Sequence, residues 1–314
     1  MAWGRVVQMT VRTQLSRDGN VWTWKDTDIS NLHMTFKIDR STVFNDNSAE
    51  FVVYNASENT RNNVLARGSN VRFSAGYSDT GTIGQLFTGN IIDSQSERIG
   101  PDWVTTIQAA SMRSDEKPFQ ITPVALSFAK DVPLSTVLDS LGSTLGLVVA
   151  GIESANFSLP NGFVYVGAVR GALRYCKTIL NANGLDLFID NSELVVYSLG
   201  QASNFTTLFL SPDTGLLNIR SVTDSNDLVR ETVQAVLEEG NELDVVAAIA
   251  DNVQVQEKRV AISAILQPKA RPNGLVKVVG TRHNGIYLLE YLTFSGDNFG
   301  GDFNSTLEGV ATDG

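Results

Sequence analysis

One segment of this chain returns two hundred positions later, and this repeat limits the fold more than any other feature of the sequence. Residues 84–110 and 284–310 align without a gap, and each places β-branched and aromatic residues on both sides of a polar, glycine-bearing turn. That pattern is typical of two antiparallel strands. Because a slip of one residue turns every side chain to the other face, the shared spacing indicates one β unit that occurs twice. The matched apolar positions are Phe87 with Tyr287, Ile91 with Tyr291, Ile92 with Leu292, Trp103 with Phe303, and Ile107 with Leu307.

Residues 1–118 have the period of strands throughout, apart from one short helix. Ser57 or Asn55 is expected to cap that helix over residues 58–66, and Gly68 to end it. We therefore predict a first β-barrel over residues 1–118. Its strands are expected within residues 5–13, 16–24, 28–39 and 49–110.

The apolar period changes to that of helices over residues 119–200. A helix is expected over Leu134–Leu145, with Asp131 as its cap, Pro133 in its first turn and Gly146 as its stop. A second helix and two strands complete a small α+β domain that is inserted between the two β units. They are predicted over residues 172–183, 186–189 and 193–197.

The strand pattern resumes after residue 200 and predicts a second β-barrel over residues 201–314. Residues 224–252 mix strand, acidic-turn and helical features, so no single structure is predicted for them. The fold class is mainly β, with two β-barrel domains and the inserted α+β domain between them. The strands of the second barrel are expected over residues 253–266, 275–279, 287–292 and 303–310.

The charge balance argues against a protein that binds nucleic acid through its phosphates. Lys and Arg number 24 against 34 Asp and Glu, which gives a formal charge of −10. A surface of this sign suits DNA that slides past without binding. The single cysteine, Cys176, excludes an internal disulfide and a thiolate metal cluster. No apolar run approaches the length of a membrane span, so we expect no membrane anchor and synthesis in a cytoplasm.

Two Asp-Thr-Gly tripeptides resemble the motif of aspartic proteases, which need two carboxylates that share one proton. They are Asp79-Thr80-Gly81 and Asp213-Thr214-Gly215. Their spacing does not match the two-hundred-residue repeat, and Ser78 and Pro212 precede the aspartates. We therefore predict that both tripeptides form ordinary turns.

Other candidate catalytic side chains also favour a structural reading. The two histidines are His33, expected on the polar face of a strand, and His283, expected at a hairpin tip. Cys176 lies on the apolar stripe of the second helix, where a buried, inert thiol is the usual case. The chain contains no Gly-x-Ser-x-Gly, His-Glu-x-x-His, phosphate-loop or dinucleotide motif.

Two acidic groups could attract calcium, but neither has the alternating ligand spacing of a calcium loop. Carboxylate pairs for glycoside cleavage have no sequence spacing of their own, and nothing in the sequence selects a pair. We predict no catalytic, cofactor-binding or metal-binding residue, and no enzymatic activity. The two acidic groups are Glu238, Glu239, Glu242 and Asp244, and then Asp297, Asn298 and Asp302.

The two β segments resemble the two barrel domains of baseplate hub proteins of contractile-tailed bacteriophages. The resemblance to the first domain rests on Ala49–Asn55, Thr60–Asn62, Ser74–Tyr77 and Leu86–Ile91. The resemblance to the second rests on Ser263–Pro268, Pro272–Val276, Gly285–Tyr287, Ser295–Asp297 and Asp302–Phe303. It covers both barrels and, more loosely, the insertion, while residues 224–252 are longer than the family pattern.

The resemblance implies a structural hub with two tail-tube-like barrels per chain. Three chains would present six barrels in a pseudo-sixfold ring, which joins a sixfold tail tube to a threefold central spike and leaves a channel for DNA. The implied partners are two further copies, the tail tube or tube initiator, the spike, other baseplate proteins and a tape measure protein. The implied location is the baseplate of a virion, or a related phage-derived particle.

Two alternatives remain open. A tail-tube or tube-initiator protein would share the barrel but lack the second copy. A tail-associated cell-wall hydrolase or carbohydrate-binding component would have a cleft with paired carboxylates.

Overall fold

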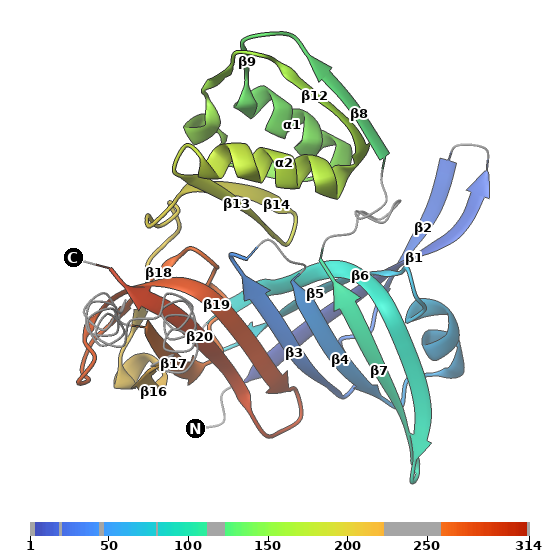
Figure 1. Cartoon of the computed structure of the whole chain (residues 1–314). Helices are drawn as coiled ribbons and strands as arrows, with labels where there is room; N and C mark the ends of the chain where they lie inside the picture. Colours follow the sequence, from blue (N-terminus) through green and yellow to red (C-terminus); the bar gives the residue numbers. More distant parts are fainter. Residues whose placement is uncertain are drawn as a thin grey trace, which may run out of the picture.

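The computed structural model describes residues 4–18, 21–43, 47–79, 81–111, 123–222 and 259–312 (Figure 1). The prediction of a mainly β fold with few helices is confirmed. The segment 224–252, for which the sequence predicts no single structure, lies outside the described residues. So does the acidic group from Glu238 to Asp244.

The first β unit holds seven strands and one helical turn. The turn, Thr60–Val64, follows Ser57, whose hydroxyl accepts a hydrogen bond from the Thr60 amide at 3.2 Å, so Ser57 and not Asn55 provides the predicted cap. The strands are β1 (Arg5–Asp18), β2 (Val21–Asp28), β3 (Met34–Ser41), β4 (Ser48–Tyr54), β5 (Asn70–Tyr77), β6 (Thr82–Ile99) and β7 (Asp102–Ala110).

The strand predicted over residues 28–39 is wrong in its first half. Strand β2 ends at Asp28 and β3 begins at Met34. Between them, Ile29 is buried, and its amide donates to the carbonyl of Met9 on β1. The Asp28 carboxylate accepts hydrogen bonds from the amide and hydroxyl of Ser30, which forms a turn here.

The middle of the chain builds small sheets around two helices, and the last part returns to strands. The middle elements are β8 (Pro123–Phe128), β9 (Val132–Pro133), α1 (Leu134–Leu145), β10 (Val148–Ala150), β11 (Ser158–Leu159), β12 (Phe163–Ala168), α2 (Val169–Asn181), β13 (Leu185–Asp190) and β14 (Glu193–Ser198). The last are β15 (Leu208–Leu210), β16 (Leu216–Ser221), β17 (Arg259–Ile265), β18 (Leu275–Val278), β19 (Gly285–Asp297) and β20 (Phe303–Ala311). Short helical turns occur at Ile152–Ala155 and Pro212–Thr214.

The two β units share one thirteen-stranded sheet. Strand β19 of the last part pairs antiparallel with β3 of the first, and Figure 1 shows β19, β3, β4 and β7 side by side. The buried side chains of both units form one hydrophobic cluster. Tyr77 on β5 joins them on the core side, because its hydroxyl donates to the carbonyl of Phe303 at 3.0 Å. The two copies therefore pack as one body, joined edge to edge.

The strand order repeats within this sheet. We call β3-β4-β7-β6 the first four-strand unit and β16-β17-β20-β19 the second, because the order and antiparallel pairing of the strands are the same in both. Each unit has a register shift at the same place in its hairpin, between Ile91 and Asp93 in the first and between Leu289 and Tyr291 in the second. A shared irregularity of this kind strongly supports the predicted duplication, because the position of a β-bulge is conserved among related β structures.

The gapless alignment is right for β7 and β20 but is displaced by two residues for β6 and β19. Arg98 pairs with Trp103 in the first hairpin, and Gly296 pairs with Phe303 in the second, so the second turn is two residues longer. The structural counterpart of Ile91 is therefore Leu289, and both are buried. The predicted matches of Ile91 with Tyr291 and of Ile92 with Leu292 are therefore wrong, and Tyr291, which lies beyond the register shift, is 44% exposed.

The displacement corrects the predicted match of Phe87 with Tyr287. Phe87 corresponds to Gly285, and Tyr287 corresponds to Gly89. A Cβ added at Gly89 would lie 2.6 Å from the Phe87 ring, and one at Gly285 would lie 3.4 Å from the Tyr287 ring. Each copy thus uses one aromatic ring and one glycine at the same two positions, in opposite order.

The inserted α+β part has a core of its own, above the large sheet in Figure 1. Helix α1 covers the predicted residues and ends at Gly146, whose φ of 68° suits glycine. The predicted cap is wrong: Pro133 precedes the helix, and Asp131 lies outside it with a φ of 61°. Helix α2 begins three residues before the prediction and buries Leu173, Cys176 and Leu180, as the apolar stripe predicts.

Candidate assembly surfaces

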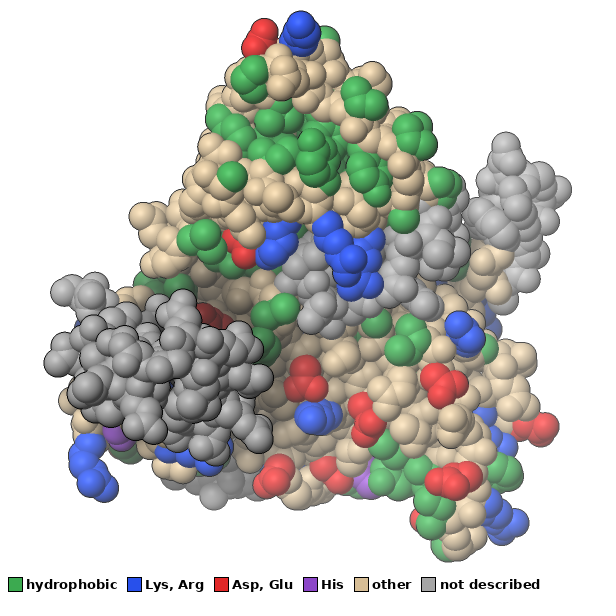
Figure 2. Space-filling model, viewed as in Figure 1, with side chains coloured by type: hydrophobic (Ala, Val, Ile, Leu, Met, Phe, Trp, Pro, Cys, Tyr) green, Lys and Arg blue, Asp and Glu red, His purple; other side chains and the backbone are tan. Residues whose placement is uncertain are grey.

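The large sheet presents a polar outer face. Along β3, Phe36 and Ile38 are buried, so the intervening side chains point outward. On the two four-strand units this face carries more carboxylates than basic groups, and Arg259 and Glu290 form an ion pair at one end. Figure 2 shows acidic and basic side chains scattered among uncharged ones over these strands. Charged residues on the outer face of the two four-strand units include Asp39, Glu50, Asp93, Glu97 and Glu308, with Lys37 and Arg220.

A buried ion cluster joins the inserted part to both β units. Arg40 on β3 donates two hydrogen bonds to the Asp190 carboxylate, at 2.8 and 2.5 Å. Arg271 donates to Asp190 at 3.1 Å and to Glu193 at 2.6 Å. Asn47 adds a weak contact to the same carboxylate at 3.4 Å. Residues from the first β part of the chain, from the β13–β14 hairpin and from the last β part therefore meet at one carboxylate.

The Asp190 carboxylate is ionised at this junction. Burial alone would raise the pKa of Asp190, but the guanidinium groups of Arg40 and Arg271 outweigh burial and hold that pKa below its ordinary value. The side chains of Arg40 and Asp190 are 2% and 0% exposed. Removal of the Asp190 charge would leave Arg40 buried without its partner, so this cluster fixes the inserted part on the sheet.

The turn between β19 and β20 forms a second junction. The Asn298 side chain accepts a hydrogen bond from the Met34 amide at 2.9 Å and donates one to the Leu32 carbonyl at 2.8 Å. His33 Nε2 lies 3.1 Å from Asp297 Oδ1, and its ring stacks on Tyr54. The prediction that His33 lies on the polar face of a strand is wrong, because His33 is in the loop before β3 and packs against this turn.

The same turn accounts for the second acidic group that the sequence singled out. Asp297 Oδ1 accepts hydrogen bonds from the amides of Phe299 and Gly300, at 2.7 and 3.2 Å. Burial alone would raise the pKa of Asp297, but these amides and His33 lower it overall. The Asp297 carboxylate thus closes a turn, and Asn298 is used in the contact with the first unit.

Among the strands of the two four-strand units, two edges are unpaired within the described residues. Strand β16 pairs only with β17, and residues 93–99 of β6 pair only with β7, because β5 covers β6 no further than Asn90. Such edges expose backbone donors and acceptors that pair readily with another strand. Both edges are candidate contact sites for another chain.

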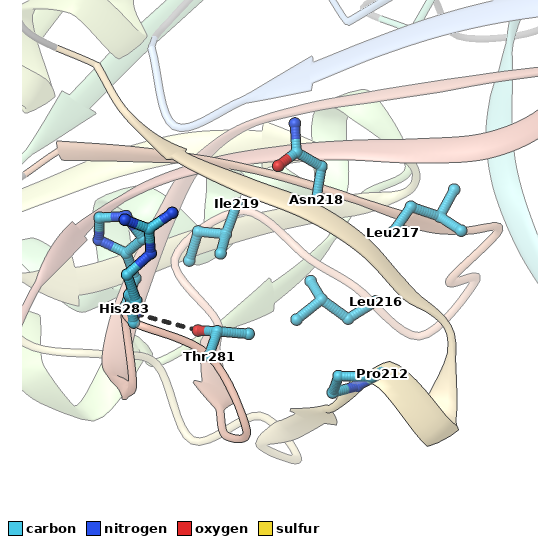
Figure 3. A pocket seen from close by; sticks show the side chains of 8 residues that line it. Pro212, Leu216, Leu217, Asn218, Ile219, Thr281 and His283 are labelled. Atoms are coloured by element: carbon cyan, nitrogen blue, oxygen red, sulfur yellow. Dashed lines mark hydrogen bonds between the residues drawn. The ribbon is translucent and has the colours of Figure 1, made fainter.

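A pocket of about 300 Å³ lies beside the β16 edge (Figure 3). One wall is β16 and the turn before it, and the other is the loop before β19. His283 lies in this loop, as predicted, where its carbonyl accepts a hydrogen bond from the Tyr287 hydroxyl at 2.9 Å. The lining residues are Pro212, Leu216, Leu217, Asn218, Ile219, Thr281, Arg282 and His283.

Comparison with known protein families identifies the family of this chain. The sequence model of the family described as baseplate hub gp41 matches residues 10–225, which is more than half of the chain. The chain belongs to the baseplate hub gp41 family. The resemblance to phage baseplate hubs that the sequence indicated is thereby confirmed. No curated protein sequence matches this member of the family.

Solved structures of tail proteins have the fold of this hub-family chain. A tail protein from Neisseria meningitidis MC58 aligns with a TM-score of 0.58 and 13% identity, over 98% of this chain and 97% of that one. The 43 kDa tail protein of prophage MuSo2 from Shewanella oneidensis aligns with the same TM-score, 11% identity and the same coverage. The E. coli c3393 protein, a component of the type VI secretion system, aligns with a TM-score of 0.54 and 8% identity, over 90% of this chain and 74% of that one.

In this hub-family chain, the side chains weighed as catalytic lie in different elements of the fold. Asp79 accepts a hydrogen bond from the Gly4 amide at 3.0 Å in a turn after β5. Asp213 lies in the helical turn that Ser211 and Thr214 cap. Thr80 is outside the described residues. Cys176 is fully buried, and burial raises the pKa of its thiol to about 12.

Two further observations concern the described part of this hub-family chain. No three His, Cys, Asp or Glu side chains within it are grouped as the ligands of a metal ion would be. None of its helices combines the length and the apolar character that a membrane crossing requires.

Proposed function

We propose that the chain is a non-enzymatic structural hub that assembles as a homotrimer. In the trimer, three chains offer six equivalent four-strand units in a pseudo-sixfold ring. The ring joins a sixfold tail tube, or its initiator, to a threefold central spike in the baseplate of a virion or a related contractile particle. Other baseplate proteins and a tape measure protein are the further partners.

The observation that carries this proposal is the repeated four-strand unit within one continuous sheet. The two copies share strand order, pairing direction and the position of a bulge, so either copy can make the same lateral contact. A cyclic trimer of such a chain imitates a hexamer while it keeps three identical faces for a threefold partner. Differences between the copies, such as Trp103 in one and Phe303 in the other, let the two sides bind different partners.

The division into a first barrel over residues 1–118, an inserted domain over 119–200 and a second barrel over 201–314 is part of the proposal. The separate core of the inserted part supports it. So does the Asp190 cluster, which would hold that part above the ring at a fixed angle.

The outer face of the sheet suits the lining of a DNA channel. On the strands of the two four-strand units, carboxylates outnumber basic groups on this face, so that part of the sheet would repel phosphates and let DNA pass without specific binding. DNA retention on a column of the purified protein at low salt would contradict this assignment of the face.

A tail-tube or tube-initiator protein is the alternative within the structural class, and a cell-wall hydrolase or carbohydrate-binding component is the alternative outside it. Sedimentation equilibrium of the purified chain separates the three. A hub gives about three times the chain mass of 34.0 kDa, a tube protein gives stacking hexamers, and a hydrolase gives a monomer that releases fragments from peptidoglycan.

A further inference from the structure

The contact between β3 and β19 inside one chain provides a pattern for contacts between chains. It joins the first strand of the first four-strand unit to the hairpin strand of the second, with Thr35 opposite Asp297 and Ser41 opposite Tyr291 at its two ends. Within the described residues, the free strand edges of the two four-strand units belong to the opposite members of these units. They are β16, which corresponds to β3, and residues 93–99 of β6, which correspond to residues 291–297 of β19.

We propose that β16 of one chain pairs antiparallel with residues 96–99 of β6 in a second copy of the same chain. This inference rests on the proposed trimer and names its contact. Repeated head to tail, the contact closes a ring of three chains, in which every junction between four-strand units has the geometry of the β3–β19 junction.

The register of the proposed contact follows from the equivalence of the two units. In the first four-strand unit, Lys37 on β3 lies opposite Glu50 on β4, which lies opposite Gln108 on β7. In the second, Arg220 on β16 lies opposite Ala261 on β17, which lies opposite Glu308 on β20. Because Gln108 and Glu308 are counterparts, Arg220 is the counterpart of Lys37.

Lys37 pairs with Ser295, and the counterpart of Ser295 is Glu97. The same register that joins β3 to β19 therefore places Arg220 directly opposite Glu97 of the neighbouring chain. Both side chains are exposed on the outer face of the single chain. Opposite charges at directly opposed positions stabilise a pair of strands, so the two free edges are complementary in charge.

The hairpin turns support the same arrangement. Inside the chain, the turn between β19 and β20 binds the start of β3 through Asn298. The corresponding turn, between β6 and β7, would reach the start of β16 in the neighbouring chain, which is where the pocket of about 300 Å³ lies (Figure 3). Ile99 at this turn is 53% exposed and Leu217 beside the pocket is 57% exposed, so the contact would cover apolar surface on both sides.

Disulfide cross-linking tests the register directly. The proposed pairing puts Ile99 of one chain opposite Asn218 of the next, and β-carbons of opposed residues lie within about 5 Å, close enough for a disulfide. The variant that carries both Ile99→Cys and Asn218→Cys should form covalent dimers and trimers on oxidation, and a reductant should reverse them. The control combines Gln95→Cys with Asn218→Cys, which are about 13 Å apart in this register and should not cross-link. The native Cys176 is buried and should not contribute.

Charge reversal gives an independent test. Arg220→Glu or Glu97→Arg alone should lower the association constant of the trimer by about tenfold or more, and the double variant should recover most of the loss. Glu308→Arg, a change of the same size on the same face, should leave association unchanged. Far-UV circular dichroism establishes that each variant is folded.

The outcomes separate this inference from the proposed function. A wild-type trimer that cross-links through positions 99 and 218 supports both. A trimer in which only the control pair cross-links, or neither pair does, overturns the β16–β6 contact and leaves the hub proposal in place. A wild-type monomer at all concentrations overturns the trimer and the contact together.

Discussion

Trp103 and Phe303 occupy the same position in the two hairpins, yet Trp103 is 38% exposed and Phe303 is 2% exposed. The Arg61 guanidinium lies 4.1 Å from the centre of a Trp103 ring, on the surface. Phe303 packs against Phe36 and Tyr77 in the shared core. The two copies thus share the backbone position, but the aromatic side chain lies in the core in one copy and at the surface in the other. The match of Trp103 with Phe303 therefore holds for the backbone position and not for burial.

Replacement of these two aromatic residues should therefore have unequal effects. Phe303→Ala should lower the free energy of unfolding by about 3 to 5 kcal/mol, because it leaves a cavity in a well-packed core. Trp103→Ala should cost about 1 kcal/mol or less, since it removes a surface cation–π contact. Urea unfolding followed by circular dichroism measures both. Equal losses at the two positions would contradict the burial that separates them.

The ion cluster at Asp190 should be sensitive to loss of one charge. Asp190→Asn should cost about 3 to 5 kcal/mol, because Arg40 would remain buried without its counter-charge. Asp26→Asn is the matched control: Asp26 also binds one arginine through two hydrogen bonds, but its side chain is 48% exposed. The control should cost about 1 kcal/mol or less.

The stability that Asp190 contributes should depend on pH. Its pKa in the folded protein lies below the ordinary value, so this stability is fully present above the pKa of the unfolded chain, about 3.9, and is lost as the pH falls toward the folded value. The difference in unfolding free energy between wild type and Asp190→Asn should be constant from pH 7 to pH 5 and should narrow below about pH 4. A difference that grows on acidification would refute an ionised Asp190.

The contact made by Asn298 should stabilise the joined β units. Asn298→Ala removes hydrogen bonds to the Met34 amide and the Leu32 carbonyl and should cost about 1 to 3 kcal/mol. Asn63→Ala is the control, because Asn63 is exposed and donates only to the Asn59 side chain among the described hydrogen bonds. The control should change the urea midpoint little. The same midpoint for both variants would argue against this turn as a junction.

The Cys176 thiol should be unreactive in the folded protein. It is fully buried on α2 and its pKa is raised to about 12, so little thiolate is exposed to a reagent at neutral pH. A disulfide reagent should label no thiol in the native protein and one thiol per chain in denaturant. Rapid native labelling at pH 7 would contradict the inert role.

The sequence predicted what local patterning determines. The helix over Leu134–Leu145 and the stripe of α2 follow from helical spacing, and the match of Ile107 with Leu307 follows from strand spacing. The match of Phe87 with Tyr287 is wrong because the second hairpin turn is two residues longer than the first. An alignment without a gap pairs the two aromatic residues and misses this difference in length. An aromatic residue and a glycine that exchange places on the same face of a strand leave the hydrophobic periodicity of the sequence unchanged, so the sequence pattern does not reveal the exchange.

The junctions could not be predicted because their partners are far apart in sequence. Arg40 and Asp190 are 150 positions apart, and Met34 and Asn298 are 264 positions apart. Nothing in the residues around Asp190 distinguishes it from an ordinary turn aspartate between two strands. The unpaired edges of β16 and β6 likewise emerge only from strand order, which depends on tertiary pairing. The sequence alone therefore gives no sign that Arg220 and Glu97 lie on these edges.

The most direct test of a chain that carries one β unit twice is a cryo-electron microscopy reconstruction of the purified assembly. We expect a ring of three chains in which six four-strand units repeat about every 60°, with the inserted parts on one side in threefold symmetry. A ring of six chains, or two halves of the chain that take unrelated places around the axis, would contradict the account.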